Sequence, residues 1–125
     1  MVVVLGVPFS GFGQLCLPEG ITLNTQYSID QFAANYPGCS SIAGNVTIGQ
    51  ASADITNLNG LSQLSSIGGN LYIFGCNGLA NFSGLHNLTS VGGNLDVISN
   101  DGLSSMAGLI NLSALGGHIT VSNND

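Results

Sequence analysis

Few side chains in this sequence have the types and spacing that catalysis or metal binding requires. The two histidines, His86 and His118, lie far apart and in different positions of the repeat described below, so we expect them at solvated or ladder positions and not as a metal pair. Cys-x-x-Cys, His-Glu-x-x-His and Gly-x-Ser-x-Gly motifs do not occur. The sequence therefore offers no zinc site and no serine nucleophile in a known setting.

The carboxylates offer little more. A pair of carboxylates can hydrolyse a glycoside when a cleft separates them. Asp96 and Asp101 are near neighbours, but Asp101 falls in a predicted turn and nothing in the sequence indicates a cleft. We expect no enzyme and no cofactor.

The charge balance excludes several kinds of partner. The 125 residues contain no lysine or arginine, and six acids give a net charge of −6. Binding to nucleic acid or to an anionic membrane surface needs cations, and a P-loop needs its lysine. With 44% hydrophobic and only 5% charged residues, the composition fits one folded domain and not charge-driven disorder.

The N-terminal residues 1–14 are apolar and resemble part of a secretory signal. The run Val2–Val7 is too short to span a bilayer, and Gly11-Phe-Gly13 fits a small-x-small cleavage site. A basic start is missing, so we interpret the segment as a signal remnant. A short first strand or hydrophobic cap is the alternative, and no membrane insertion is expected.

A sequence repeat organises the rest of the chain. Gly-Gly-Asn-Leu-Tyr-Ile at 68–73 recurs as Gly-Gly-Asn-Leu-Asp-Val at 92–97 and Gly-Gly-His-Ile-Thr-Val at 116–121, at equal intervals. A related copy, Gly44–Ile48, precedes the first at a slightly longer interval, so one extra residue lies after Ile48. Gly60, Gly84 and Gly108, each followed by leucine, keep the same period. Several columns that agree on one period of about 24 residues are the signature of a repeat architecture.

Each repeat predicts a half-buried β-strand. Apolar residues alternate with Thr47, Tyr72, Asp96 and Thr120, and a period of two with β-branched residues is typical of strands. Copies should stack about 4.8 Å apart in a parallel sheet, with Leu71, Leu95 and Ile119 in one column. Leu58, Phe82 and Met106 should continue the interior, and short extended pieces and turns, without helices, should connect the strands. We predict that the glycine pairs form the corners before the strands, because residues with a Cβ resist the backbone angles needed there.

Cys76, Asn100 and Asn124 fall in one column just after the strand. Leucine-rich repeats place Asn or Cys there, where the amide satisfies backbone groups of the turn. We therefore expect Cys76 to be an interior residue and not a nucleophile.

Residues 15–44 should cap the open N-terminal end of the core. Ile21-Thr-Leu23 precedes Val46-Thr-Ile48 by nearly one period and predicts a zeroth strand. Ile29, Phe32 and Ala33 have helical spacing before Pro37-Gly38, which predicts one helix at about 26–35. Cys16 and Cys39 flank this cap, and in a secreted chain they are a natural disulfide pair. The predicted organisation is a cap at 15–44 and a stack at 45–125, with coils at 45–69, 70–93, 94–117 and a partial coil at 118–125.

The outward face of the strands is the candidate binding surface. Tyr72, Phe74 and Ile98 should form an apolar patch with Asp96 at its rim, and exposed apolar patches mark interaction sites. Packing on a neighbouring domain and ordinary surface are the alternatives. Four glycosylation sequons, at Asn45, Asn81, Asn87 and Asn111, are little more than chance gives in so Asn-rich a chain.

Three consecutive motifs resemble the receptor L-domain repeat: Ile42-x-Gly-Asn-Val-Thr-Ile48, Ile55-Thr-Asn-Leu-Asn-Gly-Leu61 and Ile67-Gly-Gly-Asn-Leu-Tyr-Ile73. The N-terminal part, Cys16–Ile21 and Asn35–Cys39, is similar to secreted proteins of Bacteroidota-type bacteria. The resemblance implies an all-β fold, a right-handed parallel β-solenoid like that of leucine-rich repeats. It also implies a secreted or cell-surface module that binds or adheres to a protein or carbohydrate and has no catalytic residues. A structural spacer within a larger surface protein, with further domains, is the alternative.

Overall fold

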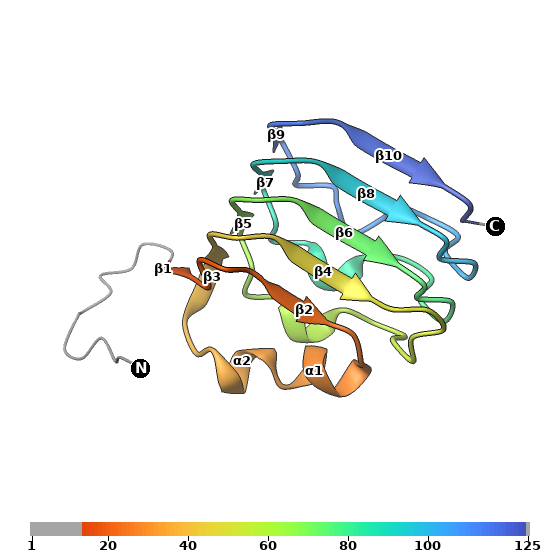
Figure 1. Cartoon of the computed structure of the whole chain (residues 1–125), viewed down its shortest axis with the longest axis horizontal. Coiled ribbons are helices and arrows are strands. Elements are labelled where there is room, and N and C mark those ends of the chain that lie inside the picture. The colour runs from red at the N-terminus through yellow and green to blue at the C-terminus, as the bar shows by residue number, and fades with distance from the viewer. Residues whose placement is uncertain (1–13, 125) are drawn as a thin grey trace.

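The structure, a computed structural model, describes residues 14–124, which alternate between two five-stranded parallel sheets (Figure 1). The long-strand sheet contains β2 (Ile21–Leu23), β4 (Val46–Gly49), β6 (Leu71–Phe74), β8 (Leu95–Ile98) and β10 (Ile119–Ser122). The short-strand sheet contains β1 (Gln14–Cys16), β3 (Cys39–Ile42), β5 (Ser66–Ile67), β7 (Ser90–Val91) and β9 (Ala114–Leu115). One short strand, one long strand and the return segment make a coil. No helix of the described residues has the length and apolar character to cross a membrane.

The predicted stacking of the strands is confirmed. Leu71 pairs with Leu95, and Leu95 pairs with Ile119, in parallel register. The zeroth strand is also present, because Ile21 in β2 pairs with Val46 in β4. The inward side chains of these strands meet those of the short-strand sheet in one core, in which most of the leucines and isoleucines are completely buried.

The short-strand sheet was not predicted as a second sheet. The sequence indicated short extended pieces and turns between the long strands but not that they pair, whereas Ser41, Ser66, Ser90 and Ala114 form a second parallel ladder. Three of its strands, β5, β7 and β9, contain only two residues each, too few to show an alternating pattern. The return segments also contain single turns of 3₁₀-helix, η1 (Asn59–Leu61) and η2 (Ser83–Leu85), where no helix was expected.

The cap consists of two short helices and not of the single helix predicted at 26–35. The first, α1 (Gln26–Asp30), and the second, α2 (Phe32–Asn35), are separated by Gln31 at φ −91°, ψ 0°, in the bridge region of backbone angles. Ile29 and Phe32, on either side of this break, are both fully buried. Figure 1 shows the two helices beneath β2, covering the N-terminal end of the stack.

Side chains fix the cap in place. Thr25 and Ser28 form a reciprocal capping box at the start of α1. The carboxylate of Asp54 accepts a hydrogen bond from the backbone N–H of Gln26 at 2.9 Å. The Gln26 Oε1 accepts from the backbone N–H groups of Thr56 and Asn57. The cap is therefore tied to the first coil by buried apolar contacts and by hydrogen bonds.

The predicted disulfide is present. Cys16 in β1 and Cys39 in β3 are bonded, with a Cα–Cα distance of 5.8 Å that lies within the normal range for disulfides. The bond closes the cap segment into a loop and joins the two neighbouring strands at the edge of the short-strand sheet.

The glycine pairs are required for a different reason from the one predicted. None of Gly68, Gly69, Gly92 or Gly93 has a positive φ, so these glycines do not supply left-handed backbone angles. A Cβ at Gly69 would instead overlap the Oδ1 atom of Asn45, and one at Gly92 would overlap the carbonyl oxygen of Gly68. Glycine is therefore needed at these positions because successive coils approach too closely to leave room for a Cβ.

The last described coil is much more exposed than the others. Met106, predicted to lie in the interior, is 37% exposed, and Ile119 and Val121 are 54% and 52% exposed. Phe82 and Leu95, one repeat earlier in their columns, are almost completely buried. The difference arises because no further coil of the described residues packs over the last one. The predicted signal remnant at 1–14 lies outside the described residues except for Gln14, which begins β1.

Candidate functional site

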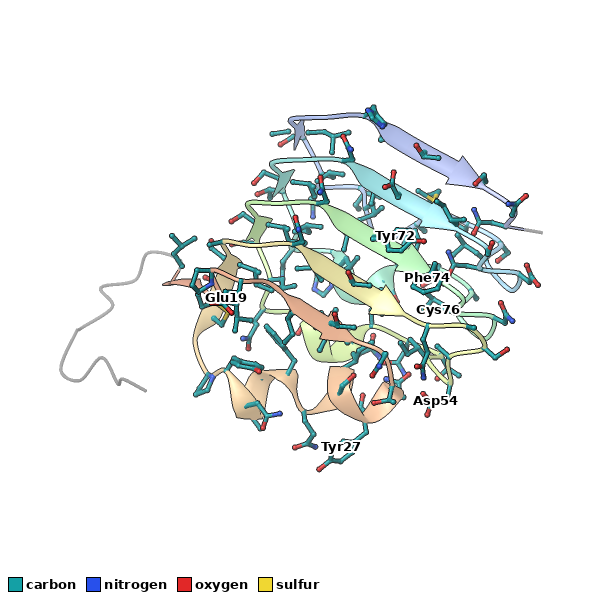
Figure 2. All side chains as sticks on the ribbon, viewed as in Figure 1. Glu19, Tyr27, Asp54, Tyr72, Phe74 and Cys76 are labelled. Atoms are coloured by element: carbon teal, nitrogen blue, oxygen red, sulfur yellow. A yellow bond between two sulfur atoms is a disulfide. The ribbon has the colours of Figure 1, made fainter. Side chains whose placement is uncertain are left out.

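The structure brings the four predicted binding residues together on two adjacent strands. Tyr72 in β6 is in register with Asp96 in β8, and Phe74 is in register with Ile98. All four side chains are half-buried on the outward face of the long-strand sheet. Figure 2 shows Tyr72 and Phe74 along β6, near the middle of the sheet. The period of two in the sequence thus located this surface.

The two aromatic rings stack on each other. The ring centroids of Tyr72 and Phe74 are 4.9 Å apart, with an angle of 20° between the ring planes. Residues two apart on a strand point to the same face, which is why the rings meet. Offset stacking at this distance is favourable for aromatic pairs, so each ring restricts the movement of the other.

A recess lies beside Tyr72 on the same sheet. It has a volume of about 280 Å³ and is lined by Asn45, Val46, Thr47, Asn70, Tyr72 and Asp96. This volume is slightly below the range of about 300–1,000 Å³ that is usual for small-molecule pockets. Phe74 and Ile98 do not line the recess. It can therefore hold one ring or side chain of a ligand whose remainder lies on the open face.

The two asparagines of this recess were not assigned to the site from the sequence. The Oδ1 atom of Asn45 accepts a hydrogen bond from the backbone N–H of Asn70 at 2.8 Å. The Oδ1 of Asn70 accepts from the N–H of Asn94 at 2.7 Å, and the Oδ1 of Asn94 accepts from the N–H of His118 at 3.0 Å. We call Asn45, Asn70 and Asn94 the outer asparagine row. The Gly-Asn pair that recurs before β4, β6 and β8, read in the register of the repeat, could have predicted this row.

These hydrogen bonds determine how each carboxamide is oriented. A backbone N–H is a donor, so the side-chain atom that faces it must be the carbonyl oxygen. The Nδ2 group of each asparagine is then directed away from the next coil. Within residues 14–124 no hydrogen bond occupies these Nδ2 groups. The outer asparagine row therefore presents donors that a ligand can use.

The electrostatic character of the site is acidic. Asp96 is its only charged residue, and the whole chain has no lysine or arginine that could pair with it. No hydrogen bond to the Asp96 carboxylate occurs within the described part of the chain. The site thus combines one acceptor group, a row of amide donors and an aromatic ring.

A larger groove lies on the short-strand sheet but has less chemistry. Its volume is about 420 Å³, and small or aliphatic residues line it: Leu15, Ser41, Ser66, Ile67, Gly68, Ser90, Val91, Gly92, Ala114, Leu115 and Gly116. The hydroxyls of Ser41 and Ser66 are 2.7 Å apart and share one hydrogen bond. With no charged or aromatic lining residue, this groove has little that could select a ligand.

Comparison with known protein families matches residues 38–125 to the receptor L domain. The chain belongs to the receptor L domain family. No curated protein and no solved structure matches the chain. The matched residues include the whole outer asparagine row and the four predicted binding residues, whereas most of the cap lies before them. The family and the Cys16–Cys39 disulfide are both typical of extracellular proteins.

The remaining reactive side chains of this receptor L domain lie apart from one another. Cys76 is completely buried, and burial raises the pKa of its thiol to about 11, which disfavours the nucleophilic thiolate. His86 is exposed and its Nδ1 donates to the Ser83 carbonyl at 2.8 Å. Asp101 is exposed in a turn. No group of three or more His, Cys, Asp or Glu side chains in the part of the chain that the structure describes could hold a metal ion.

Proposed function

We propose that this receptor L domain is a non-catalytic extracellular module that binds or adheres to a protein or carbohydrate through the outward face of its long-strand sheet. Binding would rest on surface complementarity with no covalent step. The observation that carries the proposal is the stacked pair Tyr72 and Phe74, which stands beside Asp96 on a face that no other part of the described chain covers. Aromatic side chains of this kind dominate the binding energy of many interfaces.

The rigidity of the surface supports this function. Tyr72 and Asp96 lie on strands that pair on both sides, with β4 and β8 flanking β6 and with β6 and β10 flanking β8. The inward neighbours Leu71, Ile73 and Val97 are fully buried. A surface that is ordered before binding loses little conformational entropy when the ligand arrives. Extended faces of repeat proteins are often used as binding surfaces for this reason.

We further propose that the coils wind as a right-handed solenoid similar to leucine-rich repeats, and that the protein is secreted with residues 1–14 as the remnant of its signal. The two parallel sheets support the first proposal, and the disulfide together with the family supports the second. The similarity of the cap to secreted proteins of Bacteroidota-type bacteria is consistent with a surface protein of such an organism.

A structural spacer is the second candidate. The exposed apolar side chains Met106, Ile110, Ile119 and Val121 at the end of the last coil favour it, because a neighbouring domain could cover them. In that case the stack would separate other parts of a larger surface protein. A spacer should bind no ligand at its outward face.

Binding of the full chain to arrays of glycans and of extracellular protein fragments tests the proposed function. Tyr72→Ala should weaken binding of any captured ligand at least tenfold. Tyr27→Ala is the matched control, because Tyr27 is 73% exposed and lies in α1, away from the outward face. If both variants bind the ligand as tightly as the unchanged protein does, the outward face is not the binding site. If the chain binds none of the array ligands, the spacer function is favoured.

A further inference from the structure

The outer asparagine row provides hydrogen-bond donors at fixed positions. Each Oδ1 is held by a backbone N–H of the next coil at 2.7–3.0 Å, so the carboxamide cannot turn over without losing that bond. Successive donors are separated by the distance between strands, about 4.8 Å. A ligand that meets this row therefore needs acceptor atoms, and ordering the protein costs it little entropy.

Tyr72 forms an apolar wall of the recess. Phe74 stacks on one face of the Tyr72 ring, and Tyr72, but not Phe74, lines the recess. The side of Tyr72 that lines the recess is therefore not occupied by Phe74. A ligand group in the recess can bury apolar atoms against this side, which is favourable in proportion to the area removed from water.

The charge of the site limits the ligand further. A phosphate, sulfate or carboxylate would meet Asp96 and a net charge of −6 with no lysine or arginine to neutralise it. An entirely apolar ligand would cover the Asp96 carboxylate and the asparagine amides without replacing their hydrogen bonds to water, which is costly. The ligand must therefore carry no negative charge and must offer donors, acceptors and one apolar face.

From these three features we infer that the recess binds a neutral saccharide. One pyranose ring packs its C–H face against Tyr72. Its hydroxyl groups donate to the carboxylate of Asp96 and accept from the Nδ2 groups of Asn45 and Asn70. Further sugar units extend over the outward face towards Asn94. This inference rests on the proposed function and specifies the class of ligand for the same surface.

A basic peptide is the competing ligand that the site chemistry has to reject. A lysine or arginine side chain would be attracted by Asp96 and by the Tyr72 ring. The Nδ2 groups of Asn45 and Asn70, however, carry partial positive charge and would face that cation without an acceptor. The two ligand classes therefore respond in opposite directions when one of these amide donors becomes a carboxylate.

The Asn70→Asp variant tests whether the recess binds a neutral saccharide or a basic peptide. An aspartate keeps an oxygen that accepts from the N–H of Asn94 but removes the Nδ2 donor and adds a negative charge. We expect about a two- to tenfold loss of affinity for a neutral oligosaccharide, because the hydroxyl oxygen that accepted from Nδ2 meets a second acceptor and the hydroxyl has to reorient to donate. A basic peptide should instead bind more tightly. Tyr72→Phe should retain saccharide binding because it keeps the ring, whereas Tyr72→Ala should lose most of it.

The probes are neutral gluco-, manno- and galacto-oligosaccharides, a sulfated oligosaccharide and an arginine-rich peptide, each titrated calorimetrically into the full chain at low and high salt. Circular dichroism and the unfolding midpoint of each variant establish that it is folded.

The inference requires that a neutral oligosaccharide binds, that added salt changes its affinity little and that Asn70→Asp weakens its binding. Binding of only the arginine-rich peptide, or of the sulfated sugar, would overturn the saccharide inference and leave the proposed binding function in place. Saccharide binding unaffected by Tyr72→Ala and Asn70→Asp would overturn this site, and no binding by any probe would count against both proposals.

Discussion

The backbone N–H of Cys76 donates a hydrogen bond to the Oδ1 atom of Asn100, 2.9 Å away and one repeat further along the chain. The same asparagine donates from Nδ2 to the carbonyl of Ile73 at 3.0 Å, so one side chain satisfies two backbone groups of the preceding coil. Asn124 repeats the arrangement one coil later, with Asn100 and Val97 as its partners. Asn100 is the one buried polar residue of the described chain, and it has a partner at each polar atom of its side chain.

Asn100→Ala should lower the free energy of unfolding by about 3 kcal/mol. The substitution leaves the N–H of Cys76 without a partner in the interior, at a cost of about 1–3 kcal/mol, and it also removes the hydrogen bond from the Asn100 amide to the carbonyl of Ile73. Asn124→Ala is the control, because Asn124 is only half-buried and water can replace its bonds. Urea unfolding followed by circular dichroism measures both variants. Equal losses in the two would contradict the role of burial.

Stability should depend on the ionisation of Cys76 at alkaline pH. Burial raises the pKa of this thiol from 9.0 to about 11, so the folded state holds the thiol proton more tightly than the unfolded state does. The unfolding free energy should therefore fall as the pH rises from about 9 to about 11. Below pH 9 the thiol is protonated in both states, so it should cause no change of stability with pH there. Urea midpoints at pH 8 and pH 10.5 measure the fall. Cys76→Ala should show a smaller decrease, because the two proteins differ in no other ionisable group. An equal decrease in both would exclude the thiol as the cause.

The sequence was sufficient to predict the stack because its period appears in several independent columns. Leu71, Leu95 and Ile119 follow one another in register, as the spacing of the repeat required. The short-strand sheet was missed because β5 and β7 contain two residues each, which is no more than one period of alternation. The exposure of Ile119 could not be read from its neighbours in sequence, since its motif closely resembles that of the buried Leu95. Its position at the end of the described stack determines its environment.

The candidate site was predicted only in part for a similar reason. Tyr72 and Asp96 were found because alternation places them outward on equivalent strands. Asn45 and Asn70 were missed because their orientation depends on hydrogen bonds to the following coil, and a single repeat does not reveal which atoms of a side chain those bonds use. The glycine pair was recognised, but its cause is the space needed by the Asn45 carboxamide at Gly69.

Reduction of the Cys16–Cys39 disulfide should destabilise the chain by about 3 kcal/mol. The bond closes a loop with a sequence separation of 23 residues, and the entropy of closing such a loop in the unfolded state gives a loss of about 3 kcal/mol. Urea midpoints with and without dithiothreitol measure the effect. Cys16→Ser is the control, because it has no bond to reduce and its midpoint should not respond to the reductant. An unchanged midpoint in the unmodified protein would show that the cap is held by its apolar contacts and hydrogen bonds without the disulfide.

The contact between Gly84 and the coil before it should tolerate no side chain. A Cβ at Gly84 would overlap the carbonyl carbon and oxygen of Leu58, and because these are backbone atoms they cannot move aside as a flexible side chain would. Because Gly84 does not have a positive φ, the cost of Gly84→Ala comes from this overlap and not from its backbone angles. We expect a loss of about 2–3 kcal/mol, typical of overpacked interiors. Gly78→Ala is the matched control, since a Cβ there would be 3.1 Å from the Thr56 methyl group, which can rotate away. Thermal unfolding of the two variants should separate them clearly, and equal midpoints would mean that the coils can move apart at this column.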